Sequence, residues 1–314
     1  MKRRTLLKTT AGAIIAAGLM AGSAYAQDTI RIGASGPKTG PLAGGGAVTY
    51  WPAIQLWVHD VNERGGIDVG GKKMKVELIE YDDKTSNEEA IKNYQRLMTV
   101  DKVDFVIPPY GTGINLAVAP LIAKNGYPHI AVTAVADGLD AFVERWPNTF
   151  WTLGTSEGMA NGIVDLLKKM KDEGTINSKL ALVSVADAFG IEMSKTAKPA
   201  FEAAGFEIVY ESSYPLTQQD FAPIISAAKN AGPDSFVAFS YPGDTFGLTQ
   251  QATIADLPVK AYYTGVATAF PGFAKANGAA AEGVLGIGGV NADDSKIQDF
   301  IKRQTELTKV EPDY

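Results

Sequence analysis

Short apolar runs alternate with stretches whose apolar residues recur at helical spacing along most of the chain. The runs have the length of buried strands, and the spacing of three and four residues is that of amphipathic helices. In the first half, the pattern predicts strands at residues 30–34, 74–81, 103–107 and 129–132, and helices at about 47–62, from 86, and 114–124.

The same alternation continues in the second half of the chain. It predicts strands at 180–185, 206–211, 235–239 and 261–264, and helices at 191–204, 221–230 and about 244–255. Strands separated by helices of 10–15 residues are typical of right-handed βαβ units in parallel sheets. We therefore expect an α/β protein with parallel, Rossmann-like sheets.

A shift of the sequence by 132 residues aligns the predicted strand 103–107 with the predicted strand 235–239. The alignment runs without a gap over more than fifty residues, although few residues are identical. One interpretation is an internal repeat, and hence two similar lobes. The alternative is that any two βαβ units share this pattern.

The first 26 residues have the layout of an export signal. A basic start at Lys2-Arg3-Arg4 precedes a small, apolar stretch at 11–21 and the motif Ala24-Tyr25-Ala26. This predicts cleavage after Ala26 and a periplasmic protein. The paired arginines resemble a twin-arginine signal, and Sec export is the alternative. An uncleaved anchor is a further alternative, although 11–21 is shorter than the roughly 20 residues of a membrane span.

Composition excludes several classes of chemistry. The 314 residues contain no cysteine and two histidines, so disulfides, thiolate nucleophiles and thiolate metal sites are absent. The net charge is −6, and without residues 1–26, which hold four of the 29 basic residues, it is −10. Such an acidic body lacks the clustered cations that bind nucleic acid.

No motif in the sequence indicates an enzyme or a cofactor site. The segment 66–73 resembles a phosphate-binding loop, but Lys73 replaces the hydroxyl residue and the segment precedes a strand. His59, His129 and the pair Asp82-Asp83 lack the further ligands of a metal site, so structural roles are expected for them. We therefore expect no catalytic residues, no metal and no cofactor.

Ligands of open parallel sheets bind in the crevice at the carboxyl ends of the strands. Gly111-Thr112-Gly113 lies at such an end and opens a predicted helix, so its N–H groups could hold a carboxylate. Phe189 and Tyr241 follow strands of the second half and could close over an apolar or aromatic ligand. The alternatives are ordinary helix capping by Thr112 and core packing of the two rings.

Several segments together resemble the type I periplasmic binding proteins of the branched-chain amino-acid (leucine/isoleucine/valine) importer family. They keep the family's order and spacing between Ile30 and about Gly289. The segments are Thr39-Gly40-Pro41-Leu42-Ala43, 60–67, Tyr81-Asp82-Asp83, Gly111-Thr112-Gly113, Asp187-Ala188-Phe189-Gly190, Asp220-Phe221 and Ala231-Gly232-Pro233-Asp234.

The resemblance implies two lobes, 27–148 plus 265–314 and 149–264, which are joined by crossover strands and close on a solute like a hinge. It implies a monomer that delivers a small carboxylate or amino acid to the permease of an ABC importer. In the family, the positions of Thr112 and Gly113 bind the carboxylate, those of Thr133 and Ala134 add backbone contacts, and Phe189 and Tyr241 are aromatic contacts. The full set of candidate ligand-binding residues is Tyr110, Gly111, Thr112, Gly113, Thr133, Ala134, Asp187, Phe189, Tyr241 and Val266.

Two departures from the family bear on the ligand. The loop 265–269 contains no acid, where amino-acid binders usually hold the ammonium group, and Gly44-Gly45-Gly46 replaces a bulkier residue. A buried ammonium without a counter-charge is costly, so both changes favour an aromatic or branched acid without an amine. The alternatives are a ligand-sensing receptor of the same fold and an exported α/β hydrolase. Glu311-Pro312-Asp313-Tyr314 resembles the start of a further helix, so we expect the family's C-terminal part to be missing.

Overall fold

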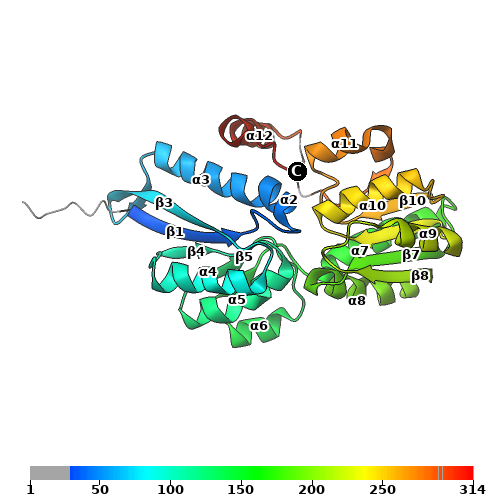
Figure 1. The fold of residues 1–314 in the computed structure, drawn as a ribbon, viewed down its shortest axis with the longest axis horizontal. Coiled ribbons are helices and arrows are strands. Elements are labelled where there is room, and N and C mark those ends of the chain that lie inside the picture. Colours follow the sequence, from blue (N-terminus) through cyan, green and yellow to red (C-terminus); the bar gives the residue numbers. More distant parts are fainter. Residues whose placement is uncertain (1–28, 289, 292, 314) are drawn as a thin grey trace, which may run out of the picture.

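Two sheets with helices packed on both faces form two lobes that lie side by side (Figure 1). The structure is a computed structural model that describes residues 29–288, 290–291 and 293–313. The predicted signal at residues 1–26 lies outside the described residues. The strands are predominantly parallel, as their apolar sequences and intervening helices predict.

The first sheet has the strand order β2-β3-β1-β4. Only the pairing of β2 with β3 is antiparallel, because a tight turn at Gly70-Gly71 joins these two strands. The elements are β1 (Thr29–Gly36), α2 (Ala43–Gly45), α3 (Trp51–Glu63), β2 (Ile67–Val69), β3 (Lys72–Asp82), α4 (Asn87–Thr99), β4 (Phe105–Ile107) and α5 (Thr112–Lys124).

The predicted helix at 47–62 begins earlier than expected and is irregular. It starts as α2, passes through a π-helical turn at Gly46–Tyr50 and continues as α3. Pro52 lies at the start of α3, where it has no N–H to donate to the preceding turn. That missing donor accounts for the local change of helical geometry.

The second sheet has the order β11-β10-β9-β7-β8 and is parallel throughout. All five residues of β9 are buried, as are six of the seven residues of β7, because helices cover both faces. The elements are α7 (Ser156–Asp172), β7 (Lys179–Val185), α8 (Ala188–Ala203), β8 (Glu207–Tyr214), α9 (Ala222–Ala231), β9 (Ser235–Phe239), α10 (Pro242–Ile254), β10 (Ala261–Thr264), α11 (Pro271–Asn277), a 3₁₀ turn (Gly278–Ala281) and β11 (Val284–Leu285).

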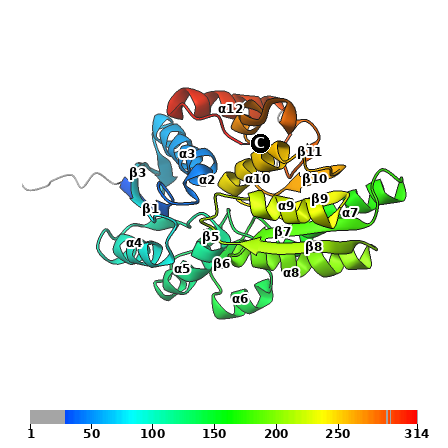
Figure 2. The same cartoon turned by 45° about the vertical axis from the view of Figure 1, so that its right-hand side comes forward.

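A short parallel pair lies between these two sheets. It consists of β5 (His129–Ala131) and β6 (Thr149–Trp151), and α6 (Leu139–Arg145) connects them. The chain leaves β6 directly for α7 of the second lobe. It returns through α12 (Ser295–Thr308), which packs beside α3 in both views (Figures 1 and 2).

One segment lies elsewhere than the expected lobe division places it. Val284 and Leu285 pair with Tyr262 and Tyr263, so β11 extends the second sheet, although 265–314 was expected in the first lobe. The free edge of β10 accepts this strand before the chain crosses back to α12. The remainder of the lobe division stays a prediction.

Candidate functional site

A cavity of about 450 Å³ lies between the two lobes, at the carboxyl ends of the strands. Tyr110 follows β4, Phe189 follows β7 and Tyr241 follows β9. In each sheet these loops flank the position where the strand order reverses, which is where α/β proteins bind ligands. The lining residues are Thr49, Tyr110, Thr112, Val132, Thr133, Val135, Leu153, Met159, Phe189, Met193, Phe239, Tyr241, Tyr263, Gly265, Val266, Ala267, Ala269, Phe270, Ile287, Val290 and Asp313.

The start of α5 forms one wall of this cavity. Gly111 precedes the helix with a φ of +92°, a conformation that glycine adopts without strain. The first N–H groups of a helix have no partner within it and carry the positive end of the helix dipole. An added Cβ on Gly113 would lie 3.7 Å from the Cβ of Ala188, so the starts of α5 and α8 meet here. This arrangement is suited to an anion.

The Thr112 side chain is already engaged within the first lobe. Its hydroxyl donates to the carbonyl oxygen of Val135 at 3.2 Å and accepts from the N–H of Val135 at 3.1 Å. Thr112 therefore fixes the loop after β5, and its backbone N–H is the group left for a ligand.

Asn115 holds the two carbonyl groups that precede the start of α5. Its Nδ2 donates to the oxygens of Pro109 and Gly111 at 2.6 and 2.9 Å. Its Oδ1 lies 3.0 Å from Nε2 of His129, so the neutral His129 carries its proton on Nε2. Burial lowers the pKa of His129 to about 4, which keeps this ring neutral at physiological pH. Thr133 adds a further hydrogen bond to the Pro109 oxygen.

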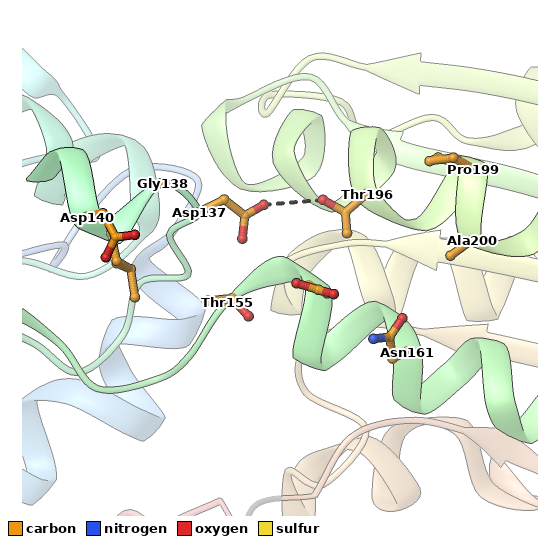
Figure 3. A pocket seen from close by; sticks show the side chains of 10 residues that line it. Asp137, Gly138, Asp140, Thr155, Asn161, Thr196, Pro199 and Ala200 are labelled. Carbon is orange, nitrogen blue, oxygen red and sulfur yellow. Dashed lines mark hydrogen bonds between the residues drawn. The ribbon is translucent and has the colours of Figure 1, made fainter.

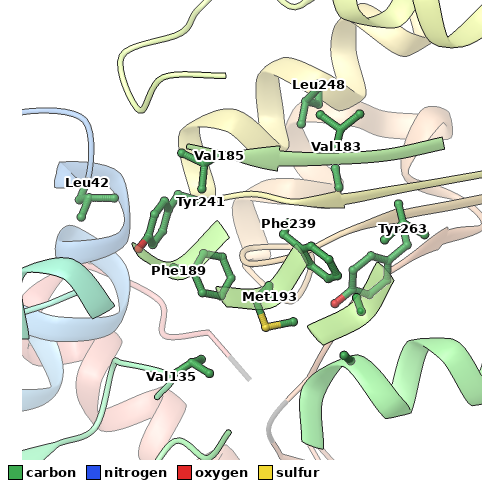
Figure 4. Close-up of a cluster of buried hydrophobic side chains, with 14 of the residues drawn as sticks. Leu42, Val135, Val183, Val185, Phe189, Met193, Phe239, Tyr241, Leu248 and Tyr263 are labelled. Atoms are coloured by element: carbon green, nitrogen blue, oxygen red, sulfur yellow. The ribbon is translucent and has the colours of Figure 1, made fainter. Parts of the chain in front are cut away.

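Two aromatic rings of the second lobe form the opposite wall. Phe189 and Tyr241 lie with their centroids 5.1 Å apart, and Figure 4 shows them between Leu42 and Met193. The Tyr241 hydroxyl donates to Oδ2 of Asp187 at 3.0 Å. An added Cβ on Gly111 would lie 3.5 Å from the same hydroxyl, so Tyr241 also reaches the first lobe.

Asp187 and Asp244 are carboxyl groups behind this aromatic wall; Asp187 is half-buried and Asp244 is buried. Asp187 accepts from the N–H of Gly190 at 3.0 Å and so caps α8. Asp244 accepts from the N–H of Tyr241 and from the hydroxyl of Tyr214. Burial raises the pKa of Asp187, and burial raises that of Asp244 to about 6. These groups position the loops rather than face the cavity.

Asp313 is the one acidic side chain among the described residues that line the cavity, and no described lysine, arginine or histidine lines it. Its carboxyl group has no ion pair with a described residue, and its charge acts on the neighbouring Tyr110. Burial raises the pKa of Asp313.

Six of the ten candidate residues line the cavity: Tyr110, Thr112, Thr133, Phe189, Tyr241 and Val266. The side chain of Asp187 turns instead to Gly190 and Tyr241. Ala134 is fully buried, and Gly111 and Gly113 adjoin Thr112 but do not themselves line the cavity. Ligand contact by any of the ten stays a prediction.

Sequence reasoning missed Met193, Phe239, Tyr263, Phe270 and Asp313, all of which line the cavity. The spacing of Phe239 and Tyr263 in buried strands could have indicated side chains on one face of the sheet. Asp313 gave no local signal, because it lies in an irregular segment after α12 and reaches the cavity from the far end of the chain.

A second hollow, of about 630 Å³, lies where α6, α7 and α8 approach one another. Figure 3 shows Asp137 between the two lobes, with its hydrogen bond to Thr196. The carboxylate of Asp137 also accepts from the N–H and hydroxyl of Ser156. Asp140 and Glu157 line the hollow as well, and three acids disfavour a carboxylate ligand there.

Among the described residues, no three histidine, aspartate or glutamate side chains are grouped so that they could hold a metal ion. Within that same part of the chain, we find no helix with the length and apolar character needed to cross a membrane.

Residues 29–314 match the family model described as "Periplasmic binding protein". A curated relative, Leu/Ile/Val-binding protein homolog 7 of Brucella suis biovar 1 (strain 1330), is 28% identical over 247 residues, which are 76% of this chain and 59% of the relative. The chain thus spans about three fifths of the length of this relative and of its counterparts in Brucella melitensis and Brucella abortus. The matched family is described as one of binding proteins, which agrees with the expectation of a non-enzymatic role.

Solved structures show the same fold. The branched-chain amino-acid substrate-binding protein LivJ of Streptococcus pneumoniae, in complex with isoleucine, has a TM-score of 0.75 and 22% identity, covering 90% of this chain and 78% of LivJ. An ABC-transporter solute-binding protein of Rhodopseudomonas palustris BisB5, in complex with 3,4-dihydroxybenzoic acid, has a TM-score of 0.73 and 24% identity. The match covers 91% of this chain and 76% of that protein. The predicted α/β fold of two lobes with parallel sheets is confirmed.

Proposed function

Because the chain belongs to the periplasmic binding protein family, we propose that it captures a small carboxylate between its two lobes for an ABC importer. The observation that carries the proposal is the cavity of about 450 Å³, which has the start of α5 on one side and aromatic side chains on the other. Unpaired N–H groups of a helix start bind a carboxylate without a cationic side chain. The aromatic wall supplies apolar contact for a branched or aromatic body.

The sequence led us to expect an amine-free ligand, in part because the loop 265–269 contains no acid. Asp313 brings an acid to the cavity from elsewhere, and it lies near Tyr110, next to the start of α5. Two ligand classes therefore fit the proposal. An α-amino acid would pair its ammonium with the Asp313 carboxylate, and an amine-free acid would bind beside a protonated Asp313.

The place of action and the partner are part of the same proposal. The family description supports a periplasmic location, and Lys2-Arg3-Arg4 with Ala24-Tyr25-Ala26 supports export. The partner would be the membrane permease of the importer, which recognises the closed pair of lobes. A ligand-sensing receptor of this fold would share the ligand site and differ in its partner.

A thermal-shift screen tests the proposal. Isoleucine, leucine, benzoate and 3,4-dihydroxybenzoate are added separately, with the matching amides as controls. A ligand at 100 times its dissociation constant stabilises the folded state by about 2.7 kcal/mol. The proposal expects at least one carboxylate to raise the unfolding temperature, without consumption of the ligand. Turnover that depends on Asp187 would instead support a hydrolase.

A further inference from the structure

Almost every hydroxyl group that lines the cavity already has a partner in the protein. The Thr49 hydroxyl donates to the Gly45 oxygen at 2.9 Å and that of Thr133 to the Pro109 oxygen at 3.0 Å. Those of Thr112 and Tyr241 donate to Val135 and Asp187, and the side chains of Tyr110 and Thr49 share a hydrogen bond.

Tyr263 differs from these residues, because its hydroxyl has no hydrogen-bond partner among the described residues. The residue lies on β10, where it pairs with Val237 and Leu285, and it is 2% exposed. Its ring meets that of Phe239 edge-on, with centroids 6.4 Å apart. Burial raises the pKa of Tyr263 above its ordinary value, so the hydroxyl keeps its proton.

The Tyr263 hydroxyl faces the apolar part of the cavity. Figure 4 shows its oxygen on the side of the ring toward Met193, with Val135 beyond Met193 in this view. Val135 is the residue that holds Thr112 at the start of α5. Tyr263 therefore lies across the apolar side chains from the proposed carboxylate position, in the other lobe.

The Tyr263 hydroxyl lines the cavity without a partner among the described residues, so a polar group of a bound ligand can supply one. We propose that Tyr263 is a specificity-determining residue, which hydrogen-bonds a hydroxyl group at the end of an aromatic acid that lies opposite its carboxylate. This inference rests on the proposed function. Within that function, it predicts that the site binds para-hydroxylated aromatic acids more tightly than their unsubstituted counterparts.

Two pairs of acids test the inference by calorimetry: benzoate with 4-hydroxybenzoate, and 3-phenylpropanoate with 3-(4-hydroxyphenyl)propanoate. The wild-type protein should bind the hydroxylated member of at least one pair about three- to tenfold more tightly, as one hydrogen bond predicts. Tyr263→Phe should abolish this preference and leave the affinity for the unsubstituted acid within about twofold.

Tyr262→Phe is the matched control. Tyr262 is the neighbouring residue of β10, its side chain points to the opposite face of the sheet, and it lines a separate hollow with Thr249 and Val284. This variant should keep the wild-type preference. The unfolding temperature of ligand-free Tyr263→Phe should stay close to that of the wild type, because the hydroxyl that is removed has no partner among the described residues.

The possible failures are distinguishable. If the wild type binds both members of each pair equally, or if Tyr263→Phe keeps the preference, the inference is wrong and the proposed function stands. A clear loss of stability in ligand-free Tyr263→Phe would also contradict the inference, because it would indicate a partner within the protein. If the wild type binds neither pair and no other carboxylate, the proposed function is wrong and the inference falls with it.

Discussion

The hydroxyl of Tyr241 donates a 3.0 Å hydrogen bond to the carboxylate of Asp187, and this contact ties the loop after β9 to the loop after β7. Asp187 also caps α8 through the N–H of Gly190. The same tyrosine hydroxyl lies near Gly111 of the other lobe. The pair therefore joins the two ligand-facing loops of the second lobe at the surface where that lobe meets the first.

Tyr241→Phe should keep the aromatic wall and remove this hydrogen bond. Asp187 would remain half-buried with one donor fewer, so the free energy of unfolding should fall by about 1–2 kcal/mol. Ligand affinity should change less than in Tyr241→Ala, which also removes the ring next to Phe189. Denaturant unfolding and calorimetry of both variants measure the two effects. Equal affinity losses in the two variants would contradict an apolar role for the ring.

Asn115→Ala should weaken carboxylate binding, because Asn115 holds the carbonyl groups of Pro109 and Gly111 before the start of α5. We expect a loss of about tenfold to a hundredfold for the best carboxylate and a smaller loss for its amide. The ratio of the two affinities is the measurement, since general destabilisation lowers both together.

Asn62→Ala is the control for this prediction. Asn62 makes a comparable pair of hydrogen bonds with the backbone of Val76, far from the cavity. This variant should lose stability and keep the affinity ratio. An unchanged ratio in Asn115→Ala would mean that the start of α5 is not the carboxylate site.

Asp313→Asn should separate the two ligand classes. The substitution should strengthen the binding of amine-free acids, because Asp313 must take up a proton before a second carboxylate binds in the same cavity, and asparagine is already neutral. It should weaken the binding of amino acids, which would lose a counter-charge for the ammonium. In titrations, the dissociation constant should rise about tenfold for isoleucine and fall about tenfold for benzoate. No change for either ligand would exclude Asp313 from the binding site.

Asp244 should make stability depend on pH. Its pKa is raised to about 6 by burial, so between about pH 4 and pH 6 the folded state holds a proton that the unfolded state has released. The contribution of this group is therefore present at low pH and is lost as pH rises through this window. Asp244→Asn should reduce the decline in unfolding free energy between pH 4 and pH 7 by roughly 2–3 kcal/mol.

The control for the pH prediction is Asp165→Asn on the exposed face of α7. This variant should unfold with the same pH dependence as the wild type. If Asp244→Asn also leaves the pH dependence unchanged, Asp244 is ionised in the folded protein throughout the window.

Local sequence signals predicted the sheets well. The apolar runs at 180–185 and 235–239 correspond to β7 and β9, and the glycines before α5 mark a helix start. The pattern of apolar residues predicted no element at 156–172, which α7 occupies in the structure. The resemblance to the type I periplasmic binding proteins, on the ordered motifs from Ile30 onward, is confirmed.

The site was harder to predict than the fold, because it depends on contacts between distant parts of the chain. Thr112 was expected at the carboxylate of a ligand, but its hydroxyl bonds Val135, which lies 23 residues away. Asp187 was expected as a candidate contact, and it bonds Tyr241, 54 residues away. Such pairings follow from tertiary packing, which the spacing of residues in one segment does not reveal.

The most direct test of the central claim is calorimetric titration of the wild-type protein with carboxylates and their amides. Isoleucine and 3,4-dihydroxybenzoate, each with its amide, represent the two ligand classes. We expect saturable binding of at least one carboxylate at one site per chain, with its amide at least tenfold weaker. Binding of neither acid, or equal binding of acid and amide, would contradict capture of a carboxylate between the lobes.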